Sequence, residues 1–176
     1  DDAGGRFTID GSTGVVTVAD GTLLNHEAAT SHDITIRATS ADTSSKDTTL
    51  TITVNDVNEF DPVANDATFN LIENSANATS VGTVSASDAD TSQTLTYSIT
   101  AGNTNNAFAI NSATGEITVN DTGEIDHETT PQYVLTIDVT DSLTPTRTDT
   151  AAITINVDDV NEFNPVVNDQ TFNVDE

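Results

Sequence analysis

Two short stretches of the sequence place acidic residues one position apart. Asp126 and Glu128 form one pair within IDHE, and Asp88 and Asp90 form another within SASDAD. In an extended chain, residues i and i+2 point to the same side, so each pair would set two carboxylates next to one another. Such neighbours repel unless a cation lies between them. Each pair is therefore a candidate part of a metal site.

A longer acidic stretch occurs twice. DVNEFDPVANDATFN at 56–70 returns as DVNEFNPVVNDQTFN at 159–173, about one domain length later. Each copy offers carboxylate, amide and carbonyl oxygens, and Ca²⁺ takes six to eight oxygen ligands of these kinds. The proline keeps the backbone before it extended. We therefore predict that both stretches are joints between tandem domains, and that the joints hold calcium.

Each acidic motif by itself has a simpler interpretation. The chain carries 29 Asp and Glu against four Lys and Arg, a formal charge of -25, which also fits a solvated acidic surface. An Asp-x-Asp arises easily by chance or in a turn of so acidic a chain, and IDHE fits an exposed strand end. Recurrence of the whole set at domain-length spacing favours metal sites. The charge would repel nucleic acid, so we expect no nucleic-acid partner.

Other chemistries fit the sequence less well. DADTSQTLTYSI begins like an EF-hand loop, but Gln93 and Ile99 replace the required Gly and Glu. Paired carboxylates also occur in glycosidases. The chain has no Trp and few aromatic residues for a sugar platform, and its acidic sets lie at domain ends. We therefore expect no enzymatic activity.

The three histidines do not cluster in the sequence, so no zinc site is predicted. His26 and His127 occupy equivalent repeat positions, which favours a shared packing or surface role. No Cys is present, so disulfides and thiolate metal sites are excluded. Asn77 and Asn120 lie in N-x-[ST] sequons, which matter only in a host that glycosylates them.

The rest of the chain predicts strands. GEITV, YVLTIDVT and TAAITINV alternate apolar and polar residues, and turn clusters such as NSATG separate them. FTIDGSTGVVTVADGTLLNHE at 7–27 aligns with FAINSATGEITVNDTGEIDHE at 108–128, which indicates a tandem array of β-sandwiches. We expect the C-terminal part of one repeat at 1–57, a complete repeat at 58–161 and the first strand of a third at 162–176.

A sandwich that lacked three strands would expose its core. We therefore expect the chain to be a section of a longer protein. The alternative is that a neighbouring chain donates the missing strands.

These motifs resemble the cadherin repeat, specifically the divergent repeats of large bacterial cell-surface adhesins. LIEN with Glu73, the two acidic pairs, FAINSATGEI, YVLTIDVTD with Asp141 and DVNEFDP carry the resemblance, which covers essentially the whole chain. It implies an all-β fold of tandem seven-stranded Greek-key sandwiches, Ig-like and of cadherin type. It also implies calcium ions in each junction that stiffen the array.

The resemblance implies one ligand set for each junction. The first set is Asn25, Glu27, Asp56, Asn58, Glu59, Asp88, Asp90 and Asp141, with the carbonyls of Val57 and Phe60. The second set is Glu73, Asp126, Glu128, Asp159, Asn161 and Glu162. Asn25 stands where the family has Asp, so the outermost site of the first junction should bind calcium more weakly.

The implied function is a calcium-stiffened extracellular module at the cell surface, structural or adhesive, within a longer repeat protein. Its partners would be calcium, neighbouring repeats and other copies of itself. One alternative is a calcium-dependent module that binds polysaccharide, with surface glycans as partners. The other is a passive spacer or filament stalk.

Overall fold

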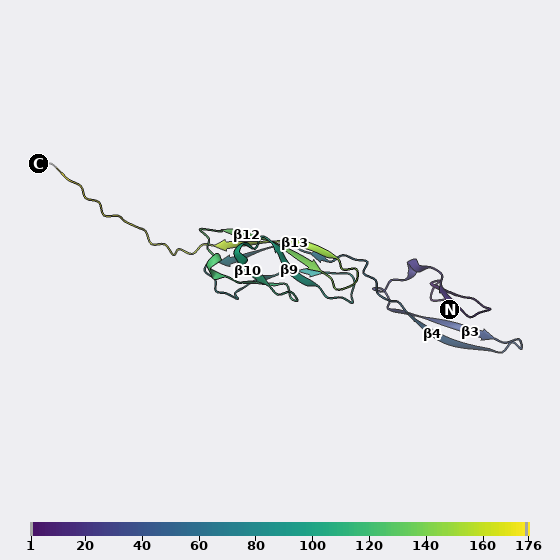
Figure 1. The fold of residues 1–176 in the computed structure, drawn as a ribbon. Helices are drawn as coiled ribbons and strands as arrows, with labels where there is room; N and C mark the ends of the chain where they lie inside the picture. The colour runs from purple at the N-terminus through teal and green to yellow at the C-terminus, as the bar shows by residue number, and fades with distance from the viewer. Residues whose placement is uncertain (1, 175) are drawn as a thin grey trace.

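The computed structural model describes residues 2–174 and 176. Figure 1 shows three parts in a row: a small N-terminal part, a larger central body and an extended C-terminal segment. Regular structure consists of strands and three short 3-10 helices, at Gly21–Leu23, Thr104–Asn106 and Thr122–Glu124. No helix in the described residues is long and apolar enough to cross a membrane. The predicted all-β fold is confirmed.

The central body is a sandwich of two sheets. The four-stranded sheet has the order β6 (Ala67–Ile72), β13 (Thr148–Asp158), β12 (Gln132–Thr140) and β9 (Thr96–Ala101). The three-stranded sheet has the order β10 (Phe108–Ile110), β11 (Glu116–Val119) and β7 (Ser80–Thr83). A short pair, β5 (Val63–Ala64) with β8 (Ala86–Ser87), extends one end. β6 runs parallel to β13 and the other neighbours are antiparallel, so the chain crosses between sheets in the predicted Greek-key manner.

Strict alternation explains the core. On β12, Tyr133, Leu135, Ile137 and Val139 are buried while the residues between them point outward. β13 does the same from Ala151 to Val157. The opposite sheet supplies further apolar side chains, and the Phe108 ring meets the edge of the Tyr133 ring at 5.0 Å between centroids. Burial of both inner faces holds the two sheets together.

The N-terminal part consists of two hairpins. β1 (Phe7–Ile9) pairs with β2 (Val16–Val18), and β3 (Ser31–Thr39) pairs with β4 (Ser45–Thr53). They repeat the hairpins β10–β11 and β12–β13 of the central body. No counterpart of β6, β7 or β9 occurs among the described N-terminal residues. The equivalent apolar side chains therefore differ in exposure: Val18 is 54% exposed and Val119 1%, while Leu50 is 41% exposed and Ile153 0%.

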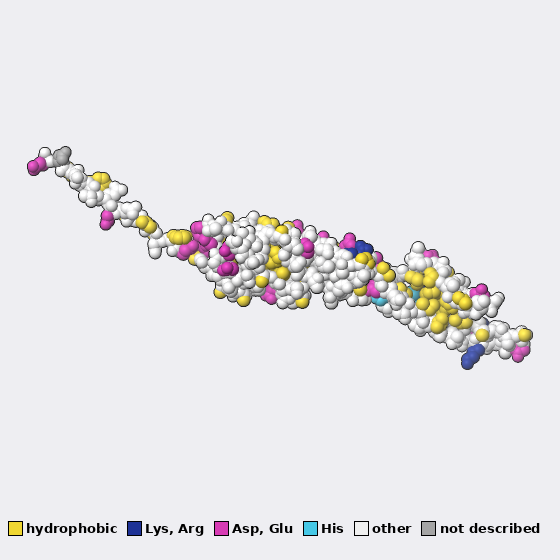
Figure 2. Space-filling view, viewed as in Figure 1, with side chains coloured by type: hydrophobic (Ala, Val, Ile, Leu, Met, Phe, Trp, Pro, Cys, Tyr) yellow, Lys and Arg dark blue, Asp and Glu magenta, His cyan; other side chains and the backbone are white. Residues whose placement is uncertain are grey.

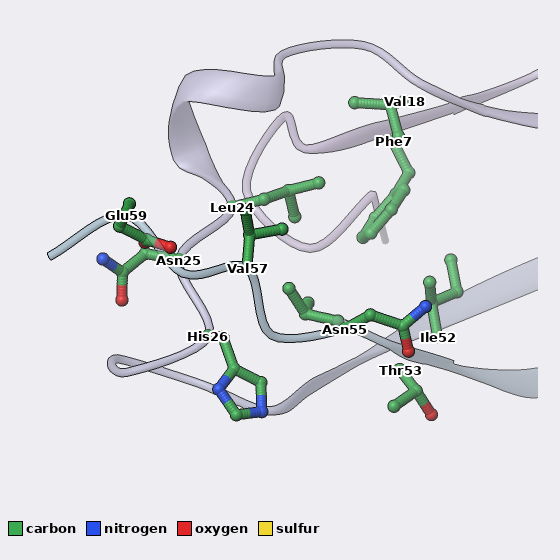
Figure 3. A pocket seen from close by; sticks show the side chains of 11 residues that line it. Phe7, Val18, Leu24, Asn25, His26, Ile52, Thr53, Asn55, Val57 and Glu59 are labelled. Atoms are coloured by element: carbon green, nitrogen blue, oxygen red, sulfur yellow. The ribbon is translucent and has the colours of Figure 1, made fainter. Parts of the chain in front are cut away.

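An apolar surface marks this open side of the N-terminal part in the space-filling view (Figure 2). At its end next to the linker lies a pocket of about 370 Å³ that Phe7, Val18, Leu24 and Val57 line (Figure 3). His26 and Glu59 border the same pocket on its polar side. The incomplete apolar interior of the first hairpins therefore lies directly beside the acidic linker.

The segment after β13 is extended and exposed, and no strand is assigned within residues 159–174. Its apolar side chains Phe163, Val166, Phe172 and Val174 are at least 70% exposed. The repeat bounds 1–57, 58–161 and 162–176, with the first strand of a third repeat in the last of them, stay predictions.

Asp149 on β13 holds β5 in place through a hydrogen bond. The Ala64 backbone N–H donates to Asp149 Oδ2 at 2.8 Å, and this bond, with one from the Thr150 N–H, lowers the pKa of the carboxyl below 3.8. A lowered pKa adds stability above the unfolded-state value and loses it as pH falls through the folded value. We expect Asp149→Asn to melt at a lower temperature than the parent at pH 7, with the difference shrinking below about pH 4. Equal melting curves at pH 7 would contradict this.

Candidate metal junctions

The first junction collects carboxylates from three separate segments. Glu27 follows β2 and a 3-10 helix, Glu59 lies in the linker and Asp90 follows β8, yet one oxygen of each lies within 4.8 Å of the others. Loss of solvation raises the pKa of Glu59, and the charges of Glu27, Asp90 and Asp56 raise it further. The N-terminal part, the linker and the central body therefore share one negative centre.

Hydrogen bonds hold the linker against the central sandwich. The buried Asn58 side chain donates to Asp141 Oδ2 at 2.7 Å and to the Pro145 carbonyl at 2.6 Å. The Phe60 backbone N–H donates to Asp90 Oδ2 at 3.0 Å. These bonds place Asn58, Asp141 and Asp90, all predicted ligands, at one end of the sandwich.

Arg147 adds a cation at the rim of the same end. Its guanidinium donates to the Asn58 carbonyl at 3.2 Å and pairs with Asp61 at 2.6 Å. The hydrogen bond with the Asp61 carboxylate raises the pKa of Arg147, so the group remains charged. Because the single guanidinium of Arg147 pairs with Asp61, it does not neutralise most of the other carboxylates of the junction.

Buried oxygens without partners distinguish this junction. They are both carboxylate oxygens of Glu27 and of Asp56, Asn58 Oδ1, Asp88 Oδ2 and Asp90 Oδ1. Buried polar atoms are nearly always hydrogen-bonded, and an unpaired buried carboxylate is costly. These carboxylate and amide oxygens are the ligand types that Ca²⁺ takes. The residues present therefore fit a calcium-binding junction.

The second junction gathers Glu73, Glu128, Asp159 and Glu162, again with one oxygen of each within 4.8 Å. Glu73 is buried, and the backbone N–H groups of Val160 and His127 lower its pKa by donating to its two oxygens. The Glu128 N–H lowers that residue's own pKa, but desolvation and the charges of Glu162, Glu73 and Asp159 outweigh it and raise the pKa. A divalent cation would relieve that repulsion.

The acidic pairs do not lie on extended strands, so that part of the prediction was wrong. Asp88 Oδ1 accepts the Asp90 backbone N–H at 3.0 Å, which makes a local turn. Asp126 accepts the Thr129 N–H at 3.2 Å and the Thr129 hydroxyl at 2.8 Å, and these bonds lower its pKa. Asp126 is not in the carboxylate group of Glu128, but a side-chain hydrogen bond with Glu128 shows that the two carboxyls do lie next to one another, as predicted. Short polar side chains prefer such backbone bonds in turns to alternation along a strand.

The remaining predicted ligands lie at the edges of the two junctions. Asn25 occupies the place of Asp126 in the first junction, and its Oδ1 accepts the Ala28 N–H at 2.6 Å. Val57 and Phe60 are exposed on the linker, and Asn161 is exposed after β13.

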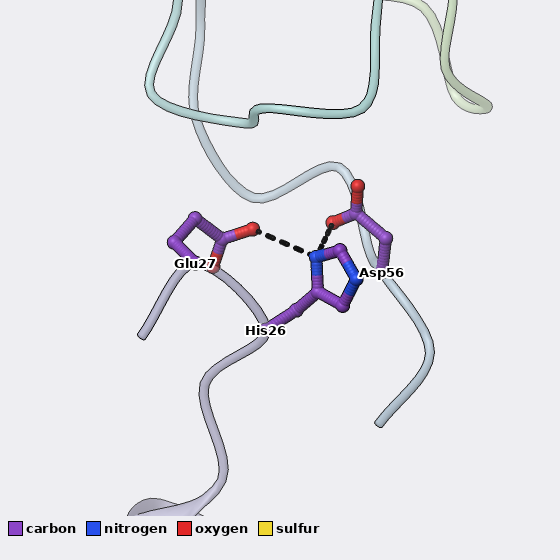
Figure 4. A group of neighbouring side chains, drawn as sticks. All are labelled: His26, Glu27 and Asp56. Carbon is purple, nitrogen blue, oxygen red and sulfur yellow. Dashed lines mark ion pairs between the residues drawn. The ribbon is translucent and has the colours of Figure 1, made fainter. Parts of the chain in front are cut away.

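The expectation that His26 and His127 share one role was also wrong. His127 Nδ1 lies 2.6 Å from the Val157 carbonyl oxygen, a contact that raises the pKa of this imidazole together with nearby carboxylates. His26 Nδ1 instead lies 3.5 Å from Glu27 Oε1 and 3.5 Å from Asp56 Oδ1 (Figure 4). Aligned sequence positions gave no signal of this difference, because it depends on where the linker carboxylate lies.

The fold and the acidic groups at its ends define a class of β-sandwich modules with acidic linkers. A family model described as Cadherin domain matches residues 67–158. Human protocadherin Fat 1 is 34% identical over 176 residues, covering 97% of this chain and 4% of that protein. Human cadherin EGF LAG seven-pass G-type receptor 2 is 37% identical over 174 residues, covering 96% of this chain and 6% of that protein.

Solved structures agree with the family match. The protocadherin gammaB7 EC3-6 cis-dimer superposes with a TM-score of 0.75 at 26% identity, over 89% of this chain and 40% of that one. The human desmocollin-1 ectodomain gives 0.69 at 27% identity, over 87% of this chain and 30% of that one. The chain belongs to the cadherin family.

The comparisons correct the prediction from sequence that the repeats come from a bacterial adhesin. The relatives named above are human proteins, and they give no support to an origin in a bacterial adhesin. The chain spans only 4–6% of the length of these curated relatives. It is an extracellular module of the cadherin type.

Proposed function

We propose that this chain is a calcium-stiffened structural and adhesive section of a longer tandem-repeat protein. The observation that carries the proposal is the meeting of Glu27, Glu59 and Asp90, three carboxylates from two repeats and their linker, with unpaired buried oxygens among them. Such a centre repels itself without a cation, and a divalent ion would join the repeats across it.

In the first junction, the ion would be held by Glu27, Asp56, Asn58, Glu59, Asp88, Asp90 and Asp141, with the carbonyls of Val57 and Phe60 and the amide of Asn25 at the rim. In the second, it would be held by Glu73, Asp126, Glu128, Asp159, Asn161 and Glu162. Bound calcium supplies positive charge that these oxygens lack. The chain's own contribution is to bring the oxygens together through the Asn58 and Phe60 bonds and to exclude water around Asp90.

The role is mechanical rather than catalytic in this proposal. Both acidic centres lie at the ends of the central body, where a bound ion would link it to the neighbouring segment of chain. Adhesion would take place through neighbouring repeats or other copies of the same protein, as the cis-dimer of the protocadherin gammaB7 relative suggests.

Melting and small-angle scattering with calcium, with chelator and with magnesium test the proposal. We expect calcium to raise the melting temperature and to lengthen the chain relative to the chelated form. Magnesium should do less, since it prefers smaller octahedral sites and retains its waters. Identical scattering profiles with calcium and with chelator would refute the stiffening role.

A further inference from the structure

The first junction contains a nitrogen donor among its carboxylates. His26 Nδ1 is buried without a hydrogen-bond partner, and so are the two oxygens that face it, Glu27 Oε1 and Asp56 Oδ1. Both oxygens lie 3.5 Å from the nitrogen, at the limit of a hydrogen bond. Figure 4 shows the imidazole edge pointing between the two carboxylates. Three unsatisfied ligand atoms from two segments thus converge on one point.

We propose that His26, Glu27 and Asp56 form a site for a tetrahedral transition-metal ion of the Zn²⁺ class. Zinc binds histidine nitrogen and carboxylate oxygen at about 2.0–2.1 Å, so two ligands at the corners of a tetrahedron lie about 3.4 Å apart. The two nitrogen-to-oxygen distances of 3.5 Å are close to that separation, and the ligand atoms of the three residues lie within 4.8 Å of one another. Water would fill the fourth position, as in other zinc sites with three protein ligands.

The nitrogen decides which metal the site prefers. Ca²⁺ is a hard ion that takes oxygen ligands, whereas imidazole suits Zn²⁺, Co²⁺, Ni²⁺ and Cu²⁺. Glu27 and Asp56 also belong to the proposed calcium set, so the two metals would compete for the same carboxylates. The site would make the first junction sensitive to transition metals as well as to calcium. The proposal does not depend on calcium binding, because the positions of His26, Glu27 and Asp56 alone bring the three ligand atoms together.

The second junction serves as an internal comparison. His127 occupies the position equivalent to His26, but its Nδ1 already lies 2.6 Å from the Val157 carbonyl oxygen. The metal-ligand group there contains Glu73, Glu128, Asp159 and Glu162 and no histidine. The transition-metal site is therefore expected at the first junction alone.

Cobalt is the probe, because tetrahedral Co²⁺ absorbs visible light strongly and octahedral Co²⁺ weakly. We expect the full chain and its His127→Gln variant to develop a tetrahedral Co²⁺ spectrum that Zn²⁺ abolishes. His26→Gln should lose that spectrum and bind Zn²⁺ at least about tenfold more weakly. Saturating calcium should raise the apparent Zn²⁺ dissociation constant of the parent chain.

Two results would overturn the site. One is a Co²⁺ spectrum and a Zn²⁺ affinity unchanged in His26→Gln, and the other is their loss in His127→Gln. Should His26→Gln fail to fold, imidazole ¹⁵N spectra of the unaltered chain decide the question. Zn²⁺ must then change the chemical shift of His26 Nδ1 and leave the chemical shifts of the His127 nitrogens unchanged. Scattering with calcium on the same variants separates the two proposals, since calcium stiffening should survive in His26→Gln.

Discussion

Replacing Asp90 with asparagine should weaken calcium binding at the first junction by roughly 10–100-fold. Loss of a residue that only supports a metal ligand already costs that much affinity, and Asp90 is placed to bind directly. Its side chain is 2% exposed, its Oδ1 has no partner and its Oδ2 accepts the Phe60 N–H. Asparagine has the same shape and retains an oxygen for Phe60, so the change removes charge and little else.

Calorimetric titration of calcium into the parent and the variant measures this effect. Asp33→Asn is the matched control, because Asp33 is an exposed residue of β3 that accepts the Thr51 hydroxyl and lies in neither acidic group. The control should titrate like the parent. Asp90→Asn with the parent's affinity would remove Asp90 from the calcium set and weaken the case for a shared centre at this junction.

Ile153→Ala should destabilise the central sandwich by about 2–5 kcal/mol, the usual cost of removing a fully buried isoleucine side chain. Ile153 is 0% exposed and lies on β13 among the residues of the core. For a domain of this size, such a loss lowers the melting temperature by roughly 10 °C or more.

Leu50 supplies the matched control because it holds the equivalent position on β4 with 41% of its surface exposed. Leu50→Ala should cost less than about 1 kcal/mol, as is usual for exposed positions. Denaturant unfolding of both variants in calcium compares them directly. Equal losses would mean that the open side of the N-terminal hairpins is covered in solution.

The fold was predictable because two periodic signals agree. Alternation in YVLTIDVT and TAAITINV places every second side chain of β12 and β13 in the core, and the repeated text gives the domain length. The acidic linker was recognisable for the same reason, since Asp56, Asn58 and Glu59 recur as a block. Long repeated patterns can be recognised in the sequence whatever the local backbone geometry is.

The details of the site were less predictable because they depend on turns and distant contacts. Asp126 caps a turn through Thr129, while Glu128 also lies near the carboxylates of Glu73, Asp159 and Glu162. His26 and His127 align in sequence yet contact different atoms, because the linker brings Asp56 to the first and a β13 carbonyl faces the second. Neither distinction is encoded in residue spacing.

The parallel pairing of β6 with β13 bears on how the module carries tension. Along the chain, β6 is the first strand of the four-stranded sheet and β13 is the last, and the two lie side by side from Ala67 beside Ile153 to Ile72 beside Asp158. A pulling force therefore enters at the start of one strand and leaves at the far end of its neighbour. The ladder between them is loaded in shear, so its hydrogen bonds must rupture together rather than unzip singly. Resistance to stretching would then be governed by the unfolding rate of the sandwich itself.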